Sequence, residues 1–178
     1  MKLTCANSPE LIKKIHRLYV SAFPKNERKP FFMLLWGRKQ GKYDIIAIRS
    51  DDNEFLGLAI VIISGKFALM DYFAVCETKR GSGIGTRALK LIQKKYKDKK
   101  FLLEIESTYV SCENLSQRLT RKKFYEHCGM KAMDYSVMWY GNELEILTYN
   151  CDVSFEEYQQ IQYRTIPKKF ADDISKIQ

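Results

Sequence analysis

The pattern of apolar and polar positions predicts two helices at the start of the chain. The first apolar stripe recurs at helical spacing and consists of Leu11, Ile12, Ile15, Leu18 and Tyr19. Ser8 and Pro9 stand directly before it, and both residue types are typical of a helix start. A bulky run at 31–36 follows Pro30 and predicts the second helical segment.

Further along, the apolar period changes and predicts mostly strands. Residues 43–49 and 55–63 read as strands joined by a polar hairpin turn, and 67–75 as the next strand. A helix to about residue 97 and a strand at 101–106 follow a glycine-rich turn, and 133–140 and 143–149 flank another hairpin signal at Gly141. Ser154 starts a closing helix. We predict one α/β domain over residues 1–178, with a loosely held tail from about 167.

Composition narrows the class of protein. The 178 residues are 46% hydrophobic, enough for a full core, and no apolar run approaches the roughly 20 residues that span a bilayer. The first residues lack the apolar segment of a signal peptide. Five cysteines, an odd and scattered number without a Cys-x-x-Cys pair, disfavour a disulfide framework and a zinc site. We therefore expect a cytoplasmic protein with no metal and no membrane association.

The net charge of +9 is concentrated in one segment. Residues 79–100 hold nine basic residues and a single aspartate. The distal lysines are read as a solvated helix face, whereas Lys79, Arg80 and Arg87 lie beside the glycine turn, where they would attract a phosphate. Because the excess charge is local to that turn, nucleic acid is not the expected partner.

The turn Arg80-Gly81-Ser82-Gly83-Ile84-Gly85 fits three glycine motifs to different degrees. A triphosphate-binding loop would need Gly-Lys before Ser or Thr, but Thr86 directly follows Gly85. The dinucleotide fingerprint matches 83–88, with Glu104 on the next strand, but residues 76–82 separate it from the preceding strand and no second βαβ half follows. In every case the turn offers backbone N–H groups at the positive end of a helix. We therefore predict a site for a phosphorylated ligand.

The third motif, Arg/Gln-x-x-Gly-x-Gly/Ala, resembles the coenzyme A loop of the GNAT superfamily of N-acetyltransferases. A second segment, Phe124-Tyr125-Glu126-His127-Cys128-Gly129-Met130, is similar to the family's Phe-Tyr-Glu-x-x-Gly-Phe signature and lies about forty residues later. The resemblance covers roughly residues 67–140. Arg118 and Arg121 stand where many members carry Asn and Ala, and the nearest asparagine is Asn114.

The resemblance implies a single GNAT-like α/β domain whose central twisted sheet is mixed, mostly antiparallel and flanked by helices. It implies acetyl-CoA as cosubstrate and an amine as acceptor, and leaves a homodimer open. The backbone N–H groups at Phe73, Ala74 and Val75 would polarise the thioester carbonyl. The cofactor would also contact Arg80, Gly81, Ser82, Gly83, Ile84, Gly85 and Thr86. Glu27 and Arg28, in a region that usually walls the acceptor pocket, are candidate acceptor contacts, with a plain loop as the alternative.

For catalysis, the resemblance assigns the acid that protonates the departing thiolate to Tyr125. On an ideal helix Arg118 and Arg121 share its face, and their charge predicts a lowered pKa of the Tyr125 hydroxyl. Glu104 and Glu106 alternate with apolar residues on one strand face, and Glu106 is the candidate base because it is nearer the strand's carboxyl end. Asp71, ion pairing of these carboxylates, and loss of the amine's proton to solvent remain alternatives.

The predicted activity is transfer of an acetyl group from acetyl-CoA to an amine of unknown identity. The alternative class is a non-catalytic module, either a coenzyme A sensor or a basic RNA-binding domain. Trp36 and the tyrosines could stack on bases, but no paired aromatic RNA signature is present. Turnover on any amine separates the enzyme from the sensor.

Overall fold

The computed structural model describes residues 1–177 and divides them into two compact units. Unit 1 comprises residues 1–63 and 70–95, and unit 2 comprises residues 64–69 and the chain from Tyr96 onward. The elements of unit 1 are β1 (Lys2–Cys5), α1 (Pro9–Ala22), α2 (Phe31–Lys39), β2 (Tyr43–Arg49), β3 (Phe55–Ser64), β4 (Phe67–Val75, its first three residues counted with unit 2), the 3-10 turn η1 (Glu77–Lys79) and α3 (Ile84–Lys95).

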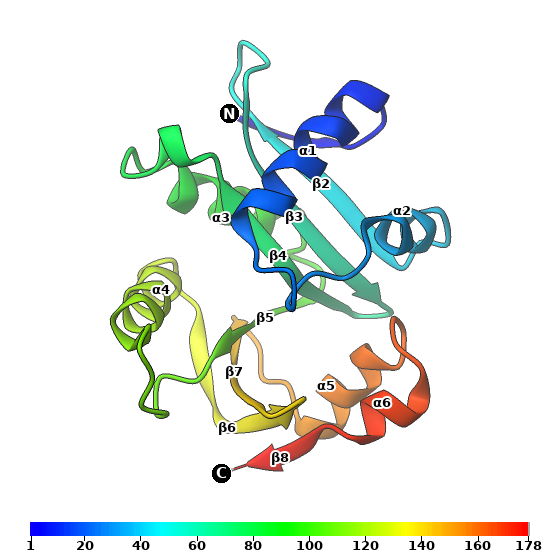
Figure 1. Ribbon diagram of the computed structural model, residues 1–178, viewed down its shortest axis with the longest axis vertical. Helices are drawn as coiled ribbons and strands as arrows, with labels where there is room; N and C mark the ends of the chain where they lie inside the picture. The colour runs from blue at the N-terminus through cyan, green and yellow to red at the C-terminus, as the bar shows by residue number, and fades with distance from the viewer. Residues whose placement is uncertain (178) are drawn as a thin grey trace. The chain divides into compact units, whose positions relative to one another are not determined.

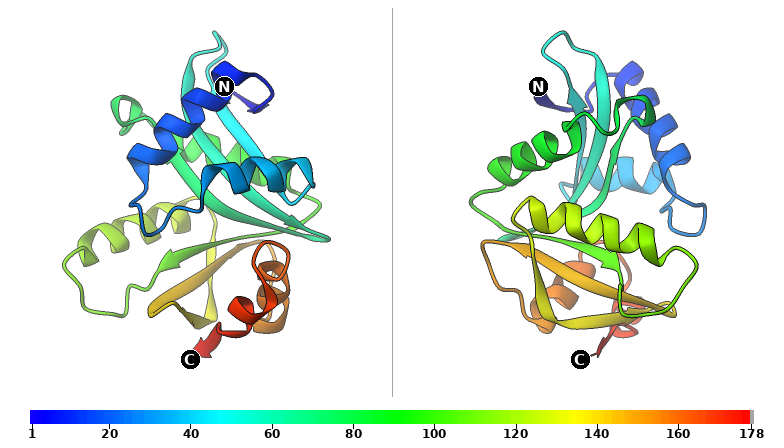
Figure 2. Two further views of the ribbon diagram at one scale, coloured as in Figure 1. Left: turned by 45° about the vertical axis from the view of Figure 1, so that its right-hand side comes forward. Right: turned by 90° about the vertical axis from the view of Figure 1, so that its left-hand side faces the viewer.

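The strands of unit 1 lie in the order β1-β2-β3-β4. The β1–β2 and β2–β3 pairs are antiparallel, with Leu3 opposite Ile48 and Ile46 opposite Ala59. Helices α1 and α2 cover one face of these strands and α3 covers the other (Figure 1 and Figure 2). β2 and β3 are therefore covered on both sides, which explains why their sequences are nearly continuous apolar runs.

Each face of unit 1 has its own core. On the α1 and α2 side, the Tyr72 ring of β4 packs edge-on against Tyr19 and Phe23, with ring centroids 4.8 and 5.0 Å away, and Phe31 of α2 lies against Tyr19.

The Ser8 hydroxyl accepts from the Leu11 N–H at 3.2 Å and so caps α1, as the sequence predicts.

Unit 2 contains the remaining elements: β5 (Lys100–Glu106), α4 (Leu115–His127), β6 (Lys131–Trp139), β7 (Asn142–Tyr149), α5 (Phe155–Gln162), α6 (Lys168–Asp172) and β8 (Ser175–Ile177). Its strands lie in the order β5-β7-β6-β8, and the three neighbouring pairs are all antiparallel. Helix α4 runs across one face of these strands, and α5 and α6 lie on the other (Figure 2). Ser154 and Glu157 form a reciprocal capping box at the start of α5.

The end of the chain differs from the expectation of a loose tail. Residues after 167 form the short helix α6 and the strand β8, which pairs with β6 from Ser136 to Met138. Ala171 and Ile174 are buried at 0% and 2% exposure, so these two apolar side chains hold the segment in place. A short amphipathic stretch after a proline has too few residues for its period to be read from sequence.

The remaining elements confirm the predicted class, an α/β chain of mostly antiparallel strands flanked by helices. The boundaries of the predicted elements agree with the structure to within about three residues, close to the usual uncertainty of helix and strand ends, whereas strand β1 was not predicted. Among the described residues, no helix combines the length and the apolar character that crossing a membrane requires.

Candidate active site

The predicted coenzyme loop lies in unit 1, between the end of β4 and the start of α3. Gly81 and Gly83 have φ angles of +76° and +73°, in the left-handed region that side chains other than glycine rarely adopt. A Cβ built on either glycine would meet no atom within 4 Å. The space beside this backbone is therefore open, and a ligand can approach the peptide groups directly.

The loop continues directly into the first turn of α3. The Ser82 hydroxyl donates to the Lys79 carbonyl oxygen at 2.7 Å, which closes the loop. The first helical hydrogen bond is donated by the Arg87 N–H to the Gly83 carbonyl oxygen at 3.1 Å. The N–H groups of Ile84, Gly85 and Thr86 therefore precede the helical ladder and lie at the positive end of the helix dipole.

A small apolar cluster fixes the start of α3 against the strands. Ile84 and Ala88 of α3 pack with Ile48 and Leu56, and the side chains of Phe73 and Val75 lie against this cluster. The helix start is therefore tied to the end of β4, so the backbone at Phe73–Val75 and the glycine loop form one rigid part of unit 1.

Gly57 on β3 is a residue that the sequence reasoning missed. A Cβ at Gly57 would collide with the carbonyl oxygen of Ala74, and the Cys76 N–H donates to the Leu56 carbonyl oxygen at 2.8 Å beside it. Only glycine lets β3 and β4 approach this closely at the proposed carbonyl-polarising segment. The available signal was a glycine in the middle of an otherwise apolar strand.

The basic residues around the loop differ in their availability. The Lys79 ammonium pairs with the Glu54 carboxylate at 2.9 Å. Arg80 and Arg87 are exposed and take part in no ion pair within residues 1–177. Two of the three predicted phosphate-attracting side chains therefore remain available to a ligand.

Glu27 and Arg28 lie in the loop between α1 and α2, which β4 holds in place. The Tyr72 hydroxyl donates to the Glu27 carbonyl oxygen at 2.9 Å and accepts from the Lys29 N–H at 3.1 Å. Burial, and then the charge of Asp71, raise the pKa of Tyr72 well above its ordinary value, so its hydroxyl keeps its proton. The Nε of Arg28 is buried and has no hydrogen-bond partner within residues 1–177.

Asp71, the alternative base, forms an ion pair within the same unit. Its carboxylate pairs with the Lys29 ammonium at 2.6 Å, and the two side chains are only 13% and 23% exposed. The Tyr19 hydroxyl in turn donates to the Lys29 carbonyl oxygen at 3.0 Å. This arrangement explains why the loop after α1 is ordered although its sequence is polar.

Tyr125 and Glu106, the predicted catalytic pair, lie in unit 2. The Glu106 carboxylate accepts from two arginines of α4: Oε1 lies 2.7 Å from Arg118 Nη2, and Oε2 lies 3.1 Å from Arg121 Nη1. Both oxygens thus have a cationic donor, so taking up a proton would cost at least one of these bonds. The structure therefore shows Glu106 in ion pairs, the alternative to a role as base, and its partners are arginines.

The predicted lowering of the Tyr125 pKa is wrong. The residue is 8% exposed, and burial raises the pKa of its hydroxyl to about 12, with the charge of Arg121 lowering it and Cys128 raising it by smaller amounts. Burial is the larger cause and outweighs the charge of Arg121, whose guanidinium also pairs with Glu106. The hydroxyl is therefore protonated at neutral pH.

Asn114 also proves to be committed. Its side-chain oxygen accepts from Arg118 Nε at 2.9 Å, while Arg118 Nη1 donates to the Ser107 carbonyl oxygen at 3.0 Å. Arg118, at the position where many GNAT members carry asparagine, thus joins the start of α4 to the end of β5.

Two carboxylates in unit 2, the buried Glu145 and the half-buried Glu104, were not singled out from the sequence as centres of hydrogen-bond networks. Glu145, with a 4% exposed side chain, accepts from the Thr108 N–H and hydroxyl at 2.8 and 2.7 Å and pairs with Lys122. Glu104 accepts from the Tyr158 hydroxyl at 2.8 Å and from Gln162 Nε2 at 2.6 Å. Glu104 and Glu106 therefore bind partners on different helices, α5 and α4. A glutamate within an apolar strand was the signal for both networks.

Comparisons with known proteins identify the family of this chain. The model of the acetyltransferase (GNAT) family matches residues 12–130, which include the glycine loop and Tyr125. A search of curated proteins finds no significant match.

Solved structures share the fold at low sequence identity. A protein from Bacteroides thetaiotaomicron described as a GNAT-family acetyltransferase is 18% identical, with a TM-score of 0.76 over 96% of this chain and 99% of that one. An aminoglycoside 6'-N-acetyltransferase complexed with coenzyme A is 15% identical, with a TM-score of 0.64 over 86% and 100%. A chimera of the Vibrio cholerae spermidine N-acetyltransferase SpeG is 14% identical, with a TM-score of 0.63 over 84% and 95%.

The family match spans about two thirds of the sequence and contains both signature segments. The chain belongs to the acetyltransferase (GNAT) family and is an N-acetyltransferase of that type.

Proposed function

We propose that this protein transfers an acetyl group from acetyl-CoA to an amine, and that the turn Arg80–Thr86 holds the pyrophosphate of the coenzyme. One observation carries the proposal: two left-handed glycines with open space beside them lead into the first turn of α3. Peptide N–H groups at such a helix start bind anions without the help of a charged side chain. A structural relative complexed with coenzyme A supports the choice of ligand.

The exposed arginines at the loop support the same ligand. Arg80 and Arg87 add positive charge beside the helix start and have no ion pair of their own in the described residues. Charge at an exposed site acts through solvent and is screened by salt. The affinity for acetyl-CoA should therefore fall as the salt concentration rises.

In the proposed reaction, the amine nitrogen attacks the thioester carbonyl, a C–N bond forms, and the C–S bond breaks to release a thiolate that needs a proton. The backbone at Phe73, Ala74 and Val75 is the proposed source of N–H groups that polarise the carbonyl. Tyr125 is the proposed proton donor, and a pKa of about 12 keeps its hydroxyl protonated and able to donate.

A general base is the least constrained part of the mechanism. Glu106 as base stays a prediction, but its contacts with Arg118 and Arg121 favour a holding role between β5 and α4. We therefore propose that the acceptor amine loses its proton to water before or during attack. This route predicts a rate that rises with pH as the free amine increases.

Glu27 and Arg28 remain the proposed acceptor contacts. The buried Arg28 Nε without an acceptor supports this role, because a buried donor is normally hydrogen-bonded. The structural relatives include acetyltransferases that act on aminoglycosides and on spermidine. We propose that the acceptor is a primary amine, and these two classes are the first to test.

The test is a screen for release of coenzyme A from acetyl-CoA with aminoglycosides, polyamines, amino acids and peptides as acceptors. The proposal expects turnover that depends on one amine class, with the acetylated product identified by mass spectrometry. Binding of acetyl-CoA with no turnover on any amine class would contradict the proposed reaction while leaving the coenzyme site intact.

A further inference from the structure

A pocket of about 180 Å³ lies within unit 2, where the segment after β5 meets the β6–β7 hairpin. Val110 and Met138 form apolar parts of its lining, and Cys112 contributes a thiol. The polar lining includes Glu106, the predicted base, together with Arg118 and Glu143. A water molecule occupies about 30 Å³ in the liquid, so a pocket of about 180 Å³ is large enough for a small aliphatic group.

Glu143 brings a carboxylate to this pocket without a cationic partner. Its Oε1 accepts from the Ser107 and Ser136 hydroxyls at 2.9 and 3.2 Å. Within residues 1–177, neither an ion pair nor a further hydrogen bond engages the other oxygen, Oε2. Glu143 is half-buried, and a carboxylate withdrawn from water is normally paired with a positive charge.

The basic residue of the pocket does not supply that charge. Arg118 donates to Glu106, to the Asn114 side chain and to the Ser107 carbonyl oxygen, at 2.7, 2.9 and 3.0 Å. Its five N–H groups are therefore largely engaged, and its ion-pair partner is Glu106, which it shares with Arg121.

We propose that this pocket binds an alkylammonium group, with Glu143 Oε2 accepting from the ammonium and Val110 and Met138 packing against the aliphatic stem. A carboxylate and an ammonium form the stronger, charge-assisted kind of hydrogen bond. The ligand is either the amine acceptor itself or an amine that is not acetylated. Binding of an ammonium group can be measured without turnover, and Glu106, the predicted base, also lines the pocket.

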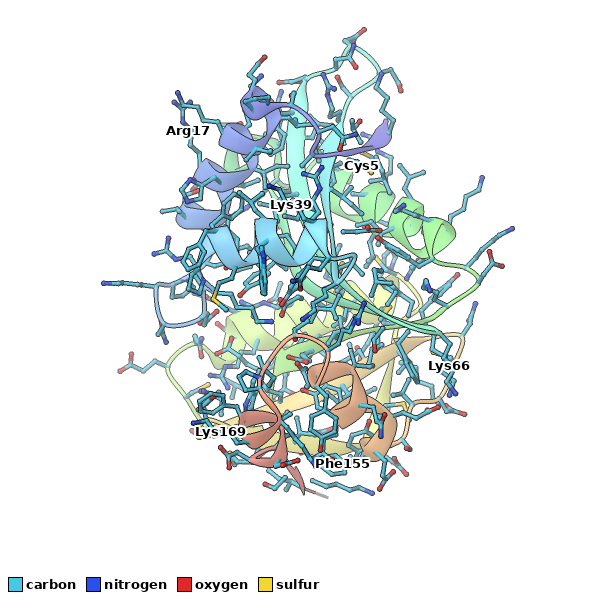
Figure 3. All side chains as sticks on the ribbon, turned by 90° about the vertical axis from the view of Figure 1, so that its right-hand side faces the viewer. Cys5, Arg17, Lys39, Lys66, Phe155 and Lys169 are labelled. Carbon is cyan, nitrogen blue, oxygen red and sulfur yellow. The ribbon has the colours of Figure 1, made fainter. Side chains whose placement is uncertain are left out.

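Cys112 provides a readout of occupancy that needs no activity. Its thiol lines the pocket, whereas Cys5 is exposed on the edge strand β1 of unit 1 (Figure 3). Alkylation of each cysteine by iodoacetamide is followed by peptide mass spectrometry with and without n-butylammonium chloride. We expect n-butylammonium to slow alkylation of Cys112 at least several-fold and to leave Cys5 unchanged. Potassium chloride and n-butanol at the same concentration control for salt and for the apolar stem.

Glu143→Gln removes the charge but keeps the shape and the acceptor for Ser107 and Ser136. We expect n-butylammonium to protect Cys112 roughly tenfold less well in this variant, the worth of one charge-assisted hydrogen bond. Glu126→Gln, an exposed position on α4 outside the pocket lining, is the matched control and should protect like the wild type. Equal protection by n-butanol in the wild-type protein, or undiminished protection in a folded Glu143→Gln variant, would overturn the proposal.

A second measurement identifies the source of the ammonium group. A diamine acceptor held here shows a raised KM and an unchanged kcat in Glu143→Gln, whereas a monoamine shows neither change. Protection of Cys112 by N,N-dimethylbutylammonium, which keeps one N–H donor and cannot form a stable amide, together with an unchanged KM, instead indicates a separate effector site. Both results require the pocket to bind ammonium, and absence of protection by every amine tested would contradict it.

Discussion

The coenzyme loop of unit 1 and the α4 cluster of unit 2, which consists of Glu106, Arg118, Arg121 and Tyr125, contribute to the proposed chemistry in opposite ways. The loop offers backbone: Gly81 and Gly83 leave open space, and Arg80 and Arg87 have no ion pair in the described residues. The polar groups of the α4 cluster already have partners or are shielded from solvent, since both oxygens of Glu106 accept from arginines and Tyr125 is buried. Binding an anion needs exposed N–H groups, whereas holding a neutral acid needs burial.

The largest effect is expected for Tyr125→Phe, which removes the proposed acid and keeps the ring. The rate of single-turnover acetylation should fall by roughly 10²–10⁴, while the Kd for acetyl-CoA stays within a few-fold. A pKa of about 12 places the hydroxyl in its protonated form up to alkaline pH. The kcat of the wild type should therefore show no alkaline decline between about pH 7 and about pH 10.

Tyr135→Phe is the matched control for that variant. Tyr135 is also buried in unit 2, and its hydroxyl donates to the Val153 carbonyl oxygen at 3.0 Å. Its loss should lower the free energy of unfolding by about 1 kcal/mol without the loss of rate. Near-normal single-turnover kinetics in Tyr125→Phe would show that solvent protonates the thiolate and that Tyr125 only packs.

Gly83→Glu tests the open half of the comparison. The variant places a carboxylate beside the N–H groups of α3 and should weaken acetyl-CoA binding on the order of 10²-fold, measured by calorimetry. Gly41→Glu is the control, because Gly41 also has a positive φ (+68°) and open space around it but lies far along the sequence from the loop. Both variants carry similar backbone strain, so an equal effect on affinity would contradict the assignment.

Glu106→Gln tests whether Glu106 in the α4 cluster has a structural role or a catalytic one. Loss of the contacts to Arg118 and Arg121 should lower the free energy of unfolding by about 1 kcal/mol, because these partly exposed ion pairs are screened by solvent. We expect kcat to fall less than about tenfold. Urea denaturation and steady-state kinetics give both numbers. A loss of about 10² in kcat at unchanged stability would identify Glu106 as the base.

The smallest effect concerns a charged contact that joins the turn before β4, strand β5 and helix α5 of unit 2. Hydrogen bonds from Lys100 and Lys66 lower the pKa of Glu157 to about 2. A carboxyl with a lowered pKa stabilises the fold above its ordinary pKa of 4.5, and this contribution is lost as pH falls toward 2. The difference in Tm between wild type and Glu157→Gln should be largest at neutral pH and should shrink below about pH 4.5. A difference independent of pH would contradict the charge assignment.

The same contrast explains how much could be predicted from the sequence. The coenzyme loop could be predicted because left-handed glycines and a helix start produce a characteristic spacing in the sequence. The strands could be predicted from the alternation of apolar residues. The direction of the Tyr125 pKa was not readable, because it depends on burial and on Glu106 competing for Arg118 and Arg121. Such competition is set by contacts between residues distant in sequence.

The short helix after Pro167 and the role of Gly57 show the same limit at the level of the fold. Five residues of α6 are too few for a period, and Gly57 is required only because the Ala74 carbonyl oxygen lies where its Cβ would be. Neither constraint leaves a local pattern that can be distinguished from chance. Local backbone geometry was therefore predictable, whereas close approach and side-chain pairing were not.

The central claim is that peptide N–H groups at the start of α3 bind the pyrophosphate, and amide chemical shifts test it most directly. Titration of coenzyme A into the ¹⁵N-labelled protein should move the amide proton signals of Ser82, Gly83, Ile84, Gly85 and Thr86 strongly downfield, because these groups would gain charge-assisted hydrogen bonds. Pantetheine, which lacks the pyrophosphate, should leave the same signals nearly unchanged. Equal shifts with both ligands, or shifts confined to other residues, would contradict the account.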